Sequence, residues 1–133
     1  MSAPPQPATP IGLLLCDDLM FTSRITGTAR DLGLCIKPAR SLEALHALIA
    51  EPCPRCVIVD LAHPELSIGA LLERLCKVCT PRPYVVAYGS HIDTATLRSA
   101  KEAGCDVVWP RSKFVEELPR ALPRWMRGET AAN

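Results

Sequence analysis

Three aspartates follow apolar segments in a pattern that suggests shared chemistry. Asp17 and Asp18 come directly after the apolar run that begins at Ile11, and Asp60 ends the run CVIVD, which begins at Cys56. Neighbouring carboxylates repel one another, so three of them are tolerated close together where a cation neutralises their charge. Ligation by oxygen alone suits Mg²⁺. A lone Asp at a strand end often serves as a helix cap or loop residue. Two such sites in suitable strands favour an acidic cluster instead.

The apolar runs before these acids belong to an alternating series of strand-like and helix-like segments. The apolar runs predict strands at Leu13–Cys16, Leu34–Ile36, Cys56–Asp60, Tyr84–Gly89 and Cys105–Trp109. Helices are predicted after a cap at Thr22 or Ser23, after Ser41, over Ile68–Val78, after Asp93, and over Val115–Met126, where Pro119 and Pro123 should shorten or bend the last one. This alternation predicts an α/β protein with a parallel sheet and helices on both faces. Five strands fit the doubly wound, flavodoxin-like order 2-1-3-4-5.

The predicted sheet gives the acids a common position. In a doubly wound sheet, ligands bind beyond the carboxyl ends of the strands, where the first and third strands lie side by side. Asp17 and Asp18 follow the first predicted strand, and Asp60 ends the third. We therefore expect the three carboxylates to meet at one edge of the sheet.

Length and composition narrow the class of protein. The 133 residues are 48% hydrophobic and carry a net charge of +1, which is typical of one globular domain and gives no electrostatic support for nucleic-acid binding. The first apolar run is too short to span a membrane. We expect a disordered Pro-rich lead-in over residues 1–10, one domain over 11–127 and a flexible tail over 128–133. A cytoplasmic location with mostly reduced cysteines is predicted.

These features resemble the CheY-like receiver domain of two-component response regulators. The resemblance rests on the stretches LLLCDD, VIVDLAHP and EAGCDVVW and on the strand–helix spacing. It implies that Asp60 accepts a phosphoryl group in a phosphorelay, from a sensor histidine kinase or a phosphotransfer protein. It also implies a Mg²⁺ site formed by Asp17, Asp18, Asp60 and the backbone carbonyl of Ala62.

Two positions depart from the pattern of that family. The fourth strand ends in Gly89 where the family has Ser or Thr, and Ser90 follows one residue late. The family lysine after the fifth strand is replaced by Arg111, although Lys113 could take its place after a small shift of alignment. Two hypotheses follow: an atypical receiver that is phosphorylated, and a pseudo-receiver that binds its partner without phosphorylation.

The expected role is signalling rather than metabolic catalysis. The sequence contains no nucleophile elbow, Gly-rich phosphate loop, HExxH motif or dinucleotide fingerprint. A stand-alone receiver acts through contact with a downstream protein. The resemblance implies that the surface for this contact, or for a homodimer, is formed by the fourth helix, the fifth strand and the fifth helix.

Two CxxC pairs offer a different function. Cys53 and Cys56, followed by Cys76 and Cys79, have a spacing compatible with a zinc site, and both pairs are expected at the amino-end edge of the sheet. A zinc-stabilised structural domain is therefore a third hypothesis. The alternatives are that these residues pack in the core as small apolar side chains, or that two of them form a bridge on oxidation.

Histidine and tryptophan side chains complete the set of candidates. His63 follows the Asp60 segment and is expected to be a solvated loop residue, as is His91. His46 is expected at the surface or boundary of its helix. Trp109 and Trp125 are expected to pack around the last strand and the last helix.

Overall fold

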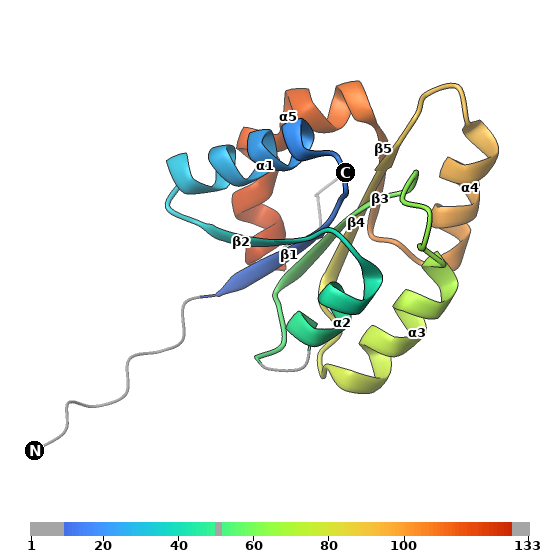
Figure 1. Ribbon diagram of the computed structural model, residues 1–133, viewed down its shortest axis with the longest axis horizontal. Coiled ribbons are helices and arrows are strands. Elements are labelled where there is room, and N and C mark those ends of the chain that lie inside the picture. Colours follow the sequence, from blue (N-terminus) through green and yellow to red (C-terminus); the bar gives the residue numbers. More distant parts are fainter. Residues whose placement is uncertain (1–9, 50–51, 129–133) are drawn as a thin grey trace, which may run out of the picture.

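A five-stranded parallel sheet forms the centre of the molecule (Figure 1). The computed structural model describes residues 10–49 and 52–128, so most of the predicted lead-in 1–10 and tail 128–133 lies outside the described residues. The strands are β1 (Ile11–Leu15), β2 (Cys35–Ala39), β3 (Cys56–Asp60), β4 (Tyr84–Gly89) and β5 (Val107–Pro110). The helices are α1 (Leu19–Asp31), α2 (Leu42–Ile49), α3 (Ile68–Val78), α4 (Thr94–Ala103) and α5 (Arg111–Met126). The order β2-β1-β3-β4-β5 with all pairs parallel confirms the predicted topology.

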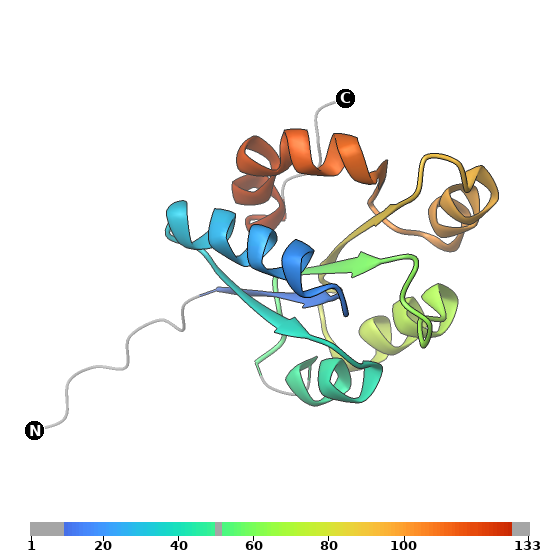
Figure 2. The ribbon, with the colours of Figure 1, turned by 45° about the horizontal axis from the view of Figure 1, so that its top comes forward.

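The helices cover the sheet in two layers (Figures 1 and 2). α1 and α5 lie on one face, and α2, α3 and α4 lie on the other. Side chains of the central strands alternate between the layers: Leu14 and Ile58 pack toward α1 and α5, whereas Leu13 and Val57 pack toward α2 and α3. Because both faces are covered, β1, β3 and β4 are buried along their whole length.

Helix α1 begins earlier than the sequence suggests. The prediction of a cap at Thr22 or Ser23 was wrong, since Asp18 is the N-cap. Its Oδ1 atom accepts hydrogen bonds from the backbone N–H groups of Met20 (3.0 Å) and Phe21 (3.1 Å). One of the predicted metal ligands therefore also starts the first helix.

Helix α5 also begins earlier, at Arg111 instead of Val115. Pro119 and Pro123 lie inside it, although a proline lacks the N–H group that an interior helical residue donates. The opposite side of this helix offsets that loss by burying a large apolar surface, formed by Phe114, Leu118, Ala121, Leu122, Trp125 and Met126.

Other helix limits agree with the sequence. The Ser41 hydroxyl accepts from the Ala44 N–H (3.1 Å), and Asp93 caps α4. Two large apolar residues at helix ends are exposed: Leu32 at 39% and Val78 at 42%. Leu32 is the C-cap of α1 and Val78 is the last residue of α3, so both extend past the part of the helix that covers the sheet.

Candidate functional site

The strand arrangement brings the predicted acids to one edge of the sheet. β1 pairs directly with β3, with Leu15 opposite Val59, so both chains leave the sheet at the same edge. We call this the carboxyl-end edge. Asp60 is 5% exposed at the end of β3, whereas Asp17 and Asp18 are exposed in the loop after β1.

The Asp60 carboxylate is held in a fixed orientation. Its Oδ1 atom accepts a hydrogen bond from the Ala62 N–H (2.9 Å) and lies 3.9 Å from Nη2 of Arg111. The backbone beyond it is also fixed, because the Leu61 N–H donates to the Tyr88 carbonyl (2.9 Å). No hydrogen bond within the described residues involves the second carboxylate oxygen, Oδ2, which therefore stays available for chemistry.

Arg111, the first residue of α5, occupies the position predicted for the cation beside Asp60. Its guanidinium carbon lies 5.6 Å from the centre of the Phe21 ring and 6.0 Å from that of Tyr88, both within cation–π range. Lys113 lies elsewhere, with its ammonium 5.1 Å from the ring centre of Trp109. Of the two candidates, Arg111 is therefore the one that faces Asp60.

An aromatic group forms the apolar wall beneath this ion pair. Tyr88 is fully buried, and its ring centre lies 4.6 Å from that of Phe114 and 4.9 Å from that of Phe21. Burial raises the pKa of the Tyr88 phenol far above its ordinary value, and the neighbouring Cys16 thiol and Asp60 charge raise it further. Tyr88 is therefore a neutral side chain, and it adds no charge to the site.

The end of β4 lacks the hydroxyl group of the family pattern. Gly89 lies opposite Pro110, and a Cβ atom at Gly89 would come within 3.3 Å of a Leu61 methyl group and 3.4 Å of a Leu97 methyl group. The Ser90 hydroxyl accepts a hydrogen bond from the Ile92 N–H (3.2 Å) and so stabilises its own loop. Neither residue contributes a hydrogen bond to Asp60 in the described structure.

The prediction that His63 is solvated was wrong, because its side chain is 5% exposed. Nε2 lies 2.7 Å from the carbonyl oxygen of Arg40, and Nδ1 accepts from the Glu65 N–H (3.2 Å). These two contacts assign the proton to Nε2. Glu65 also accepts from the Leu42 N–H (2.8 Å), so the loop after β3 is attached to the start of α2. The sequence carried no local signal for this contact between distant segments.

The donor atoms at this edge suit a magnesium ion. Carboxylates and the Ala62 carbonyl are hard oxygen ligands, and Mg²⁺ commonly uses one or two carboxylates while keeping several of its waters. Within residues 10–49 and 52–128, no group of three or more His, Cys, Asp or Glu side chains is gathered as a ready-made metal cluster. Asp18 retains Oδ2 beside its capping Oδ1, so it can serve both purposes.

The predicted four-cysteine zinc site does not form. Cys53 and Cys79 are joined by a disulfide, Cys56 is buried and Cys76 is exposed. Cys56 packs toward α1 and α5, on the opposite face of the sheet from Cys79. Burial, and then the charge of Asp106, raise the pKa of the Cys56 thiol far above its ordinary value, so the free thiol is protonated.

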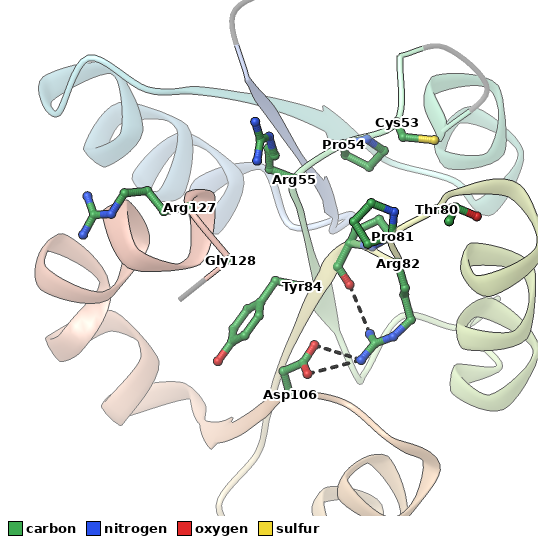
Figure 3. A pocket seen from close by; sticks show the side chains of 11 residues that line it. Cys53, Pro54, Arg55, Thr80, Pro81, Arg82, Tyr84, Asp106, Arg127 and Gly128 are labelled. Atoms are coloured by element: carbon green, nitrogen blue, oxygen red, sulfur yellow. Dashed lines mark hydrogen bonds and ion pairs between the residues drawn. The ribbon is translucent and has the colours of Figure 1, made fainter. Parts of the chain in front are cut away.

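A cavity of about 640 Å³ lies at the opposite edge of the sheet, which we call the amino-end edge (Figure 3). Two of the charged residues that line it, Arg82 and Asp106, are paired with each other. Arg82 Nη2 lies 3.2 Å from each carboxylate oxygen of Asp106, and Asp106 Oδ2 also accepts from the Val85 N–H (2.8 Å). This arrangement ties the start of β4 to the start of β5.

Two further observations concern the remaining predictions. Trp109 and Trp125 pack together as expected, with ring centres 5.5 Å apart. None of the described helices is both long enough and apolar enough to cross a membrane.

Comparisons with known proteins identify the fold. No protein-family model and no curated protein matches the sequence. Solved structures do match: a response regulator from Thermotoga maritima has a TM-score of 0.74 at 13% identity, over 90% of this chain and 98% of that one. A response regulator from Chloroflexus aurantiacus, described as putative, has a TM-score of 0.75 at 18% identity, over 90% and 98%.

The receiver domain of NtrX from Brucella abortus is a third match. It has a TM-score of 0.73 at 23% identity, over 88% of this chain and 98% of that one. The predicted resemblance to receiver domains is therefore confirmed at the level of the fold.

Proposed function

We propose that this chain, which has the fold of response-regulator receiver domains, is an atypical receiver that accepts a phosphoryl group on Asp60. The observation that carries the proposal is the state of the Asp60 carboxylate. It is buried at the end of β3, held through Oδ1 by the Ala62 N–H, and accompanied by the Arg111 guanidinium.

The proposed step is a transfer between two covalent bonds. Oδ2 of Asp60 attacks the phosphorus atom of a phosphorylated histidine on a kinase or phosphotransfer protein. The P–N bond breaks as the new P–O bond forms, and the released imidazole keeps the electron pair and takes up a proton. The hydrogen bond from Ala62 to Oδ1 leaves Oδ2 as the attacking atom.

Asp17, Asp18 and the Ala62 carbonyl would hold Mg²⁺ next to Asp60, together with Asp60 itself. A bound Mg²⁺ would neutralise the negative charge of the transferred group. The protein itself contributes by fixing the positions of these oxygen ligands. Asp18 is fixed by its role as the N-cap of α1, and Ala62 is fixed because His63 and Glu65 attach its loop to the start of α2.

Arg111 would contribute a second positive charge to the phosphoryl group. Its guanidinium rests against Phe21 and Tyr88, and so it approaches Asp60 from a defined direction. A guanidinium binds two oxygen atoms in a planar fork, whereas the lysine of the family would act as a single point of charge. We therefore expect Arg111 to stabilise the phosphorylated form more than it assists the transfer.

The output would be a contact with another protein rather than the turnover of a substrate. The proposed surface is α4–β5–α5, which could also pair two copies of the chain. Gly89 cannot supply the hydroxyl that binds the phosphoryl group in the family. Arg111 begins α5 and faces Asp60, so it is the residue through which we propose that a signal reaches this surface.

Intact-mass spectrometry after incubation with acetyl phosphate and Mg²⁺ tests the phosphoryl transfer. We expect the mass of one phosphoryl group to be added, and we expect Asp60→Ala to abolish the addition. Asp93→Ala is the matched control, because Asp93 also follows a strand at this edge but caps α4. Absence of an adduct in the unmodified chain, with no Mg²⁺ binding by titration, would contradict the proposal.

A pseudo-receiver that binds its partner without phosphorylation is the second candidate. One observation favours it: the end of β4 has Gly89 in place of a residue with a hydroxyl group. The same mass measurement separates the two candidates. A pseudo-receiver would show no adduct and would bind its partner equally well as wild type and as Asp60→Asn.

A further inference from the structure

A cavity of about 590 Å³ opens beside the start of α5, next to the Asp60 site, with which it shares Arg111. Its walls come from α1, from the loop after β4 and from the first turns of α5. The volume falls within the range of about 300–1,000 Å³ that is typical of small-molecule sites. The two helices that form it lie next to each other on one face of the sheet (Figure 2).

The charged lining of this cavity is positive. Arg24 and Arg111 contribute two guanidinium groups, His91 adds an imidazole, and none of the described carboxylates lines the cavity. Within the described residues, Arg24 takes part in no ion pair or hydrogen bond, and the ion pair of Arg111 with Asp60 is long, at 3.9 Å. Both cations therefore have donor groups left for an anion.

Further hydrogen-bond donors lie at the same end. The Ser90 and Ser112 side chains line the cavity. The N-cap of α5 is Pro110, which makes no side-chain cap, and the first turn of the helix contains no acidic residue. Among the residues that the structure describes, the first N–H groups of α5 therefore have no side-chain cap, and they add positive potential beside the two arginines.

The rest of the lining is apolar and partly aromatic. Phe21 and Val115 complete the cavity, and both are half-buried. A ligand that matches these walls combines a doubly charged anion, which two guanidinium groups bind best, with a flat organic part.

We propose that the cavity between α1 and α5 binds a small aromatic phosphate monoester, with the phosphate between Arg24 and Arg111 and the ring against Phe21 and Val115. The Asp60 carboxylate opposes this binding, because it attracts the same Arg111 guanidinium and repels the phosphate. The unphosphorylated protein is the form that binds, so the site does not require Asp60 to be a phosphoacceptor.

Phenyl phosphate is a suitable probe, with inorganic phosphate and phenol as its two halves. Binding is followed by titration in ¹H–¹⁵N NMR spectra, in the presence of EDTA so that no metal ion takes part. We expect saturable shifts of the Ser90, His91 and Ser112 amides with phenyl phosphate, and binding at least tenfold weaker with either half. If phenol or inorganic phosphate binds as tightly as phenyl phosphate, the cavity does not recognise the ring and the phosphate together, and the proposal is wrong.

Matched variants test the assigned residues. Arg24→Gln should weaken phenyl phosphate binding about tenfold or more, since one charge-assisted contact is lost. Arg30→Gln removes the same charge from an exposed position of the same helix and should change nothing. An equal loss in both variants, or no saturable binding in the unmodified chain, would show that the cavity is not this site.

The variant Asp60→Asn separates this inference from the proposed function. It should bind phenyl phosphate severalfold more tightly while it loses the adduct from acetyl phosphate. Conversely, Arg24→Gln should keep the adduct. If the unmodified chain forms no adduct but binds phenyl phosphate as described, the proposed function fails and the binding site stands. Unchanged or weaker binding by Asp60→Asn would contradict the opposition between Asp60 and the ligand.

Discussion

The two edges of the sheet carry similar kinds of side chains but use them differently. At the amino-end edge, Cys53 is bonded to Cys79, and Arg82 pairs with Asp106 through both carboxylate oxygens. At the carboxyl-end edge, Asp60 keeps one oxygen uncommitted and Arg111 approaches it at 3.9 Å.

The difference indicates where this molecule can do chemistry. A polar group whose hydrogen bonds are all made within the protein stabilises the fold and has little left for a ligand. The Asp106 carboxylate accepts from Arg82 and from the Val85 N–H, so it is a structural group. The carboxyl-end edge also has structural contacts, through His63, but these hold the loop and leave Asp60 available.

Removal of the disulfide should have the largest effect on stability and none on phosphoryl transfer. Its two cysteines are separated by 26 positions in the sequence, and a cross-link of that span stabilises by about 3 kcal/mol. We expect the double variant Cys53→Ser, Cys79→Ser to lose about this much in urea unfolding, with an unchanged yield of acetyl phosphate adduct.

Cys76→Ser is the control for that comparison, because Cys76 is an exposed free cysteine one turn away on α3. It should leave the urea midpoint unchanged. A fall in adduct yield in the double variant, measured where it is still folded, would show that the two edges are coupled.

Replacement of His63 should affect both stability and the site. His63→Ala removes two hydrogen bonds and leaves the Arg40 carbonyl without its partner, at a cost of about 2 kcal/mol. Because the Ala62 loop then loses its attachment, adduct formation should slow as well. His91→Ala, at an exposed position of the same edge, should shift the unfolding free energy by less than about 0.5 kcal/mol. Equal effects of the two variants would mean that the His63 contacts do not hold the loop.

Local sequence signals explain which parts of the fold could be predicted. β3, β4 and α3 match their predicted limits, because each is a continuous apolar or strongly periodic run with a clear boundary. The starts of α1 and α5 were missed for different reasons. Asp18 was interpreted only as a metal ligand although it is also a cap, and α5 starts after Pro110 without any capping side chain.

The site could be predicted only in part. The carboxylates lie at one edge because strand order determines where strand ends meet, and this follows from the pattern of elements. The contact of His63 with Arg40 and the pairing of Cys53 with Cys79 join segments that are distant in the sequence. No local pattern specifies which loop another loop will touch, so these features required the structure.

A hydroxyl group introduced at the end of β4 would test the carboxyl-end edge directly. We expect it to lower the folding stability less than the two changes above. Gly89→Ser places a Cβ atom 3.3 Å from Leu61, which can shift by a few tenths of an ångström, so we expect a loss of about 1 kcal/mol or less. The new hydroxyl can bind a phosphoryl group on Asp60, and the adduct should accumulate to a higher level in the mass spectrum.

Gly27→Ser is the matched control for this change. A Cβ atom at Gly27 meets nothing within 4 Å, so the variant should fold normally and leave the adduct yield unchanged. If Gly89→Ser does not raise the yield while Gly27→Ser behaves as expected, the hydroxyl is not what limits phosphorylation here.

The smallest expected effect concerns an acid at the carboxyl-end edge whose hydrogen bonds are satisfied. Asp93 accepts from the Thr96 hydroxyl (2.6 Å) and the Thr96 N–H (3.1 Å), and these bonds hold the pKa of its carboxyl group below the usual value. A depressed folded-state pKa contributes stability above the pKa of the unfolded chain, and this contribution disappears as the pH falls through the folded-state pKa. Asp93→Asn should therefore lower the urea midpoint slightly at pH 7 and leave it unchanged well below the Asp93 pKa.

Asp31→Asn, at the last residue of α1, should not lower the urea midpoint at pH 7, because a negative charge is unfavourable at the C-terminal end of a helix. Asp93 and Asp60 lie at the same edge of the sheet. A comparison of Asp93→Asn with Asp60→Asn therefore separates an acid that stabilises the fold from one that accepts a phosphoryl group. Asp93→Asn should change stability and leave the adduct intact, whereas Asp60→Asn should abolish the adduct. A loss of adduct in Asp93→Asn would mean that the start of α4 belongs to the phosphoryl site, and that satisfied hydrogen bonds do not mark an acid as purely structural.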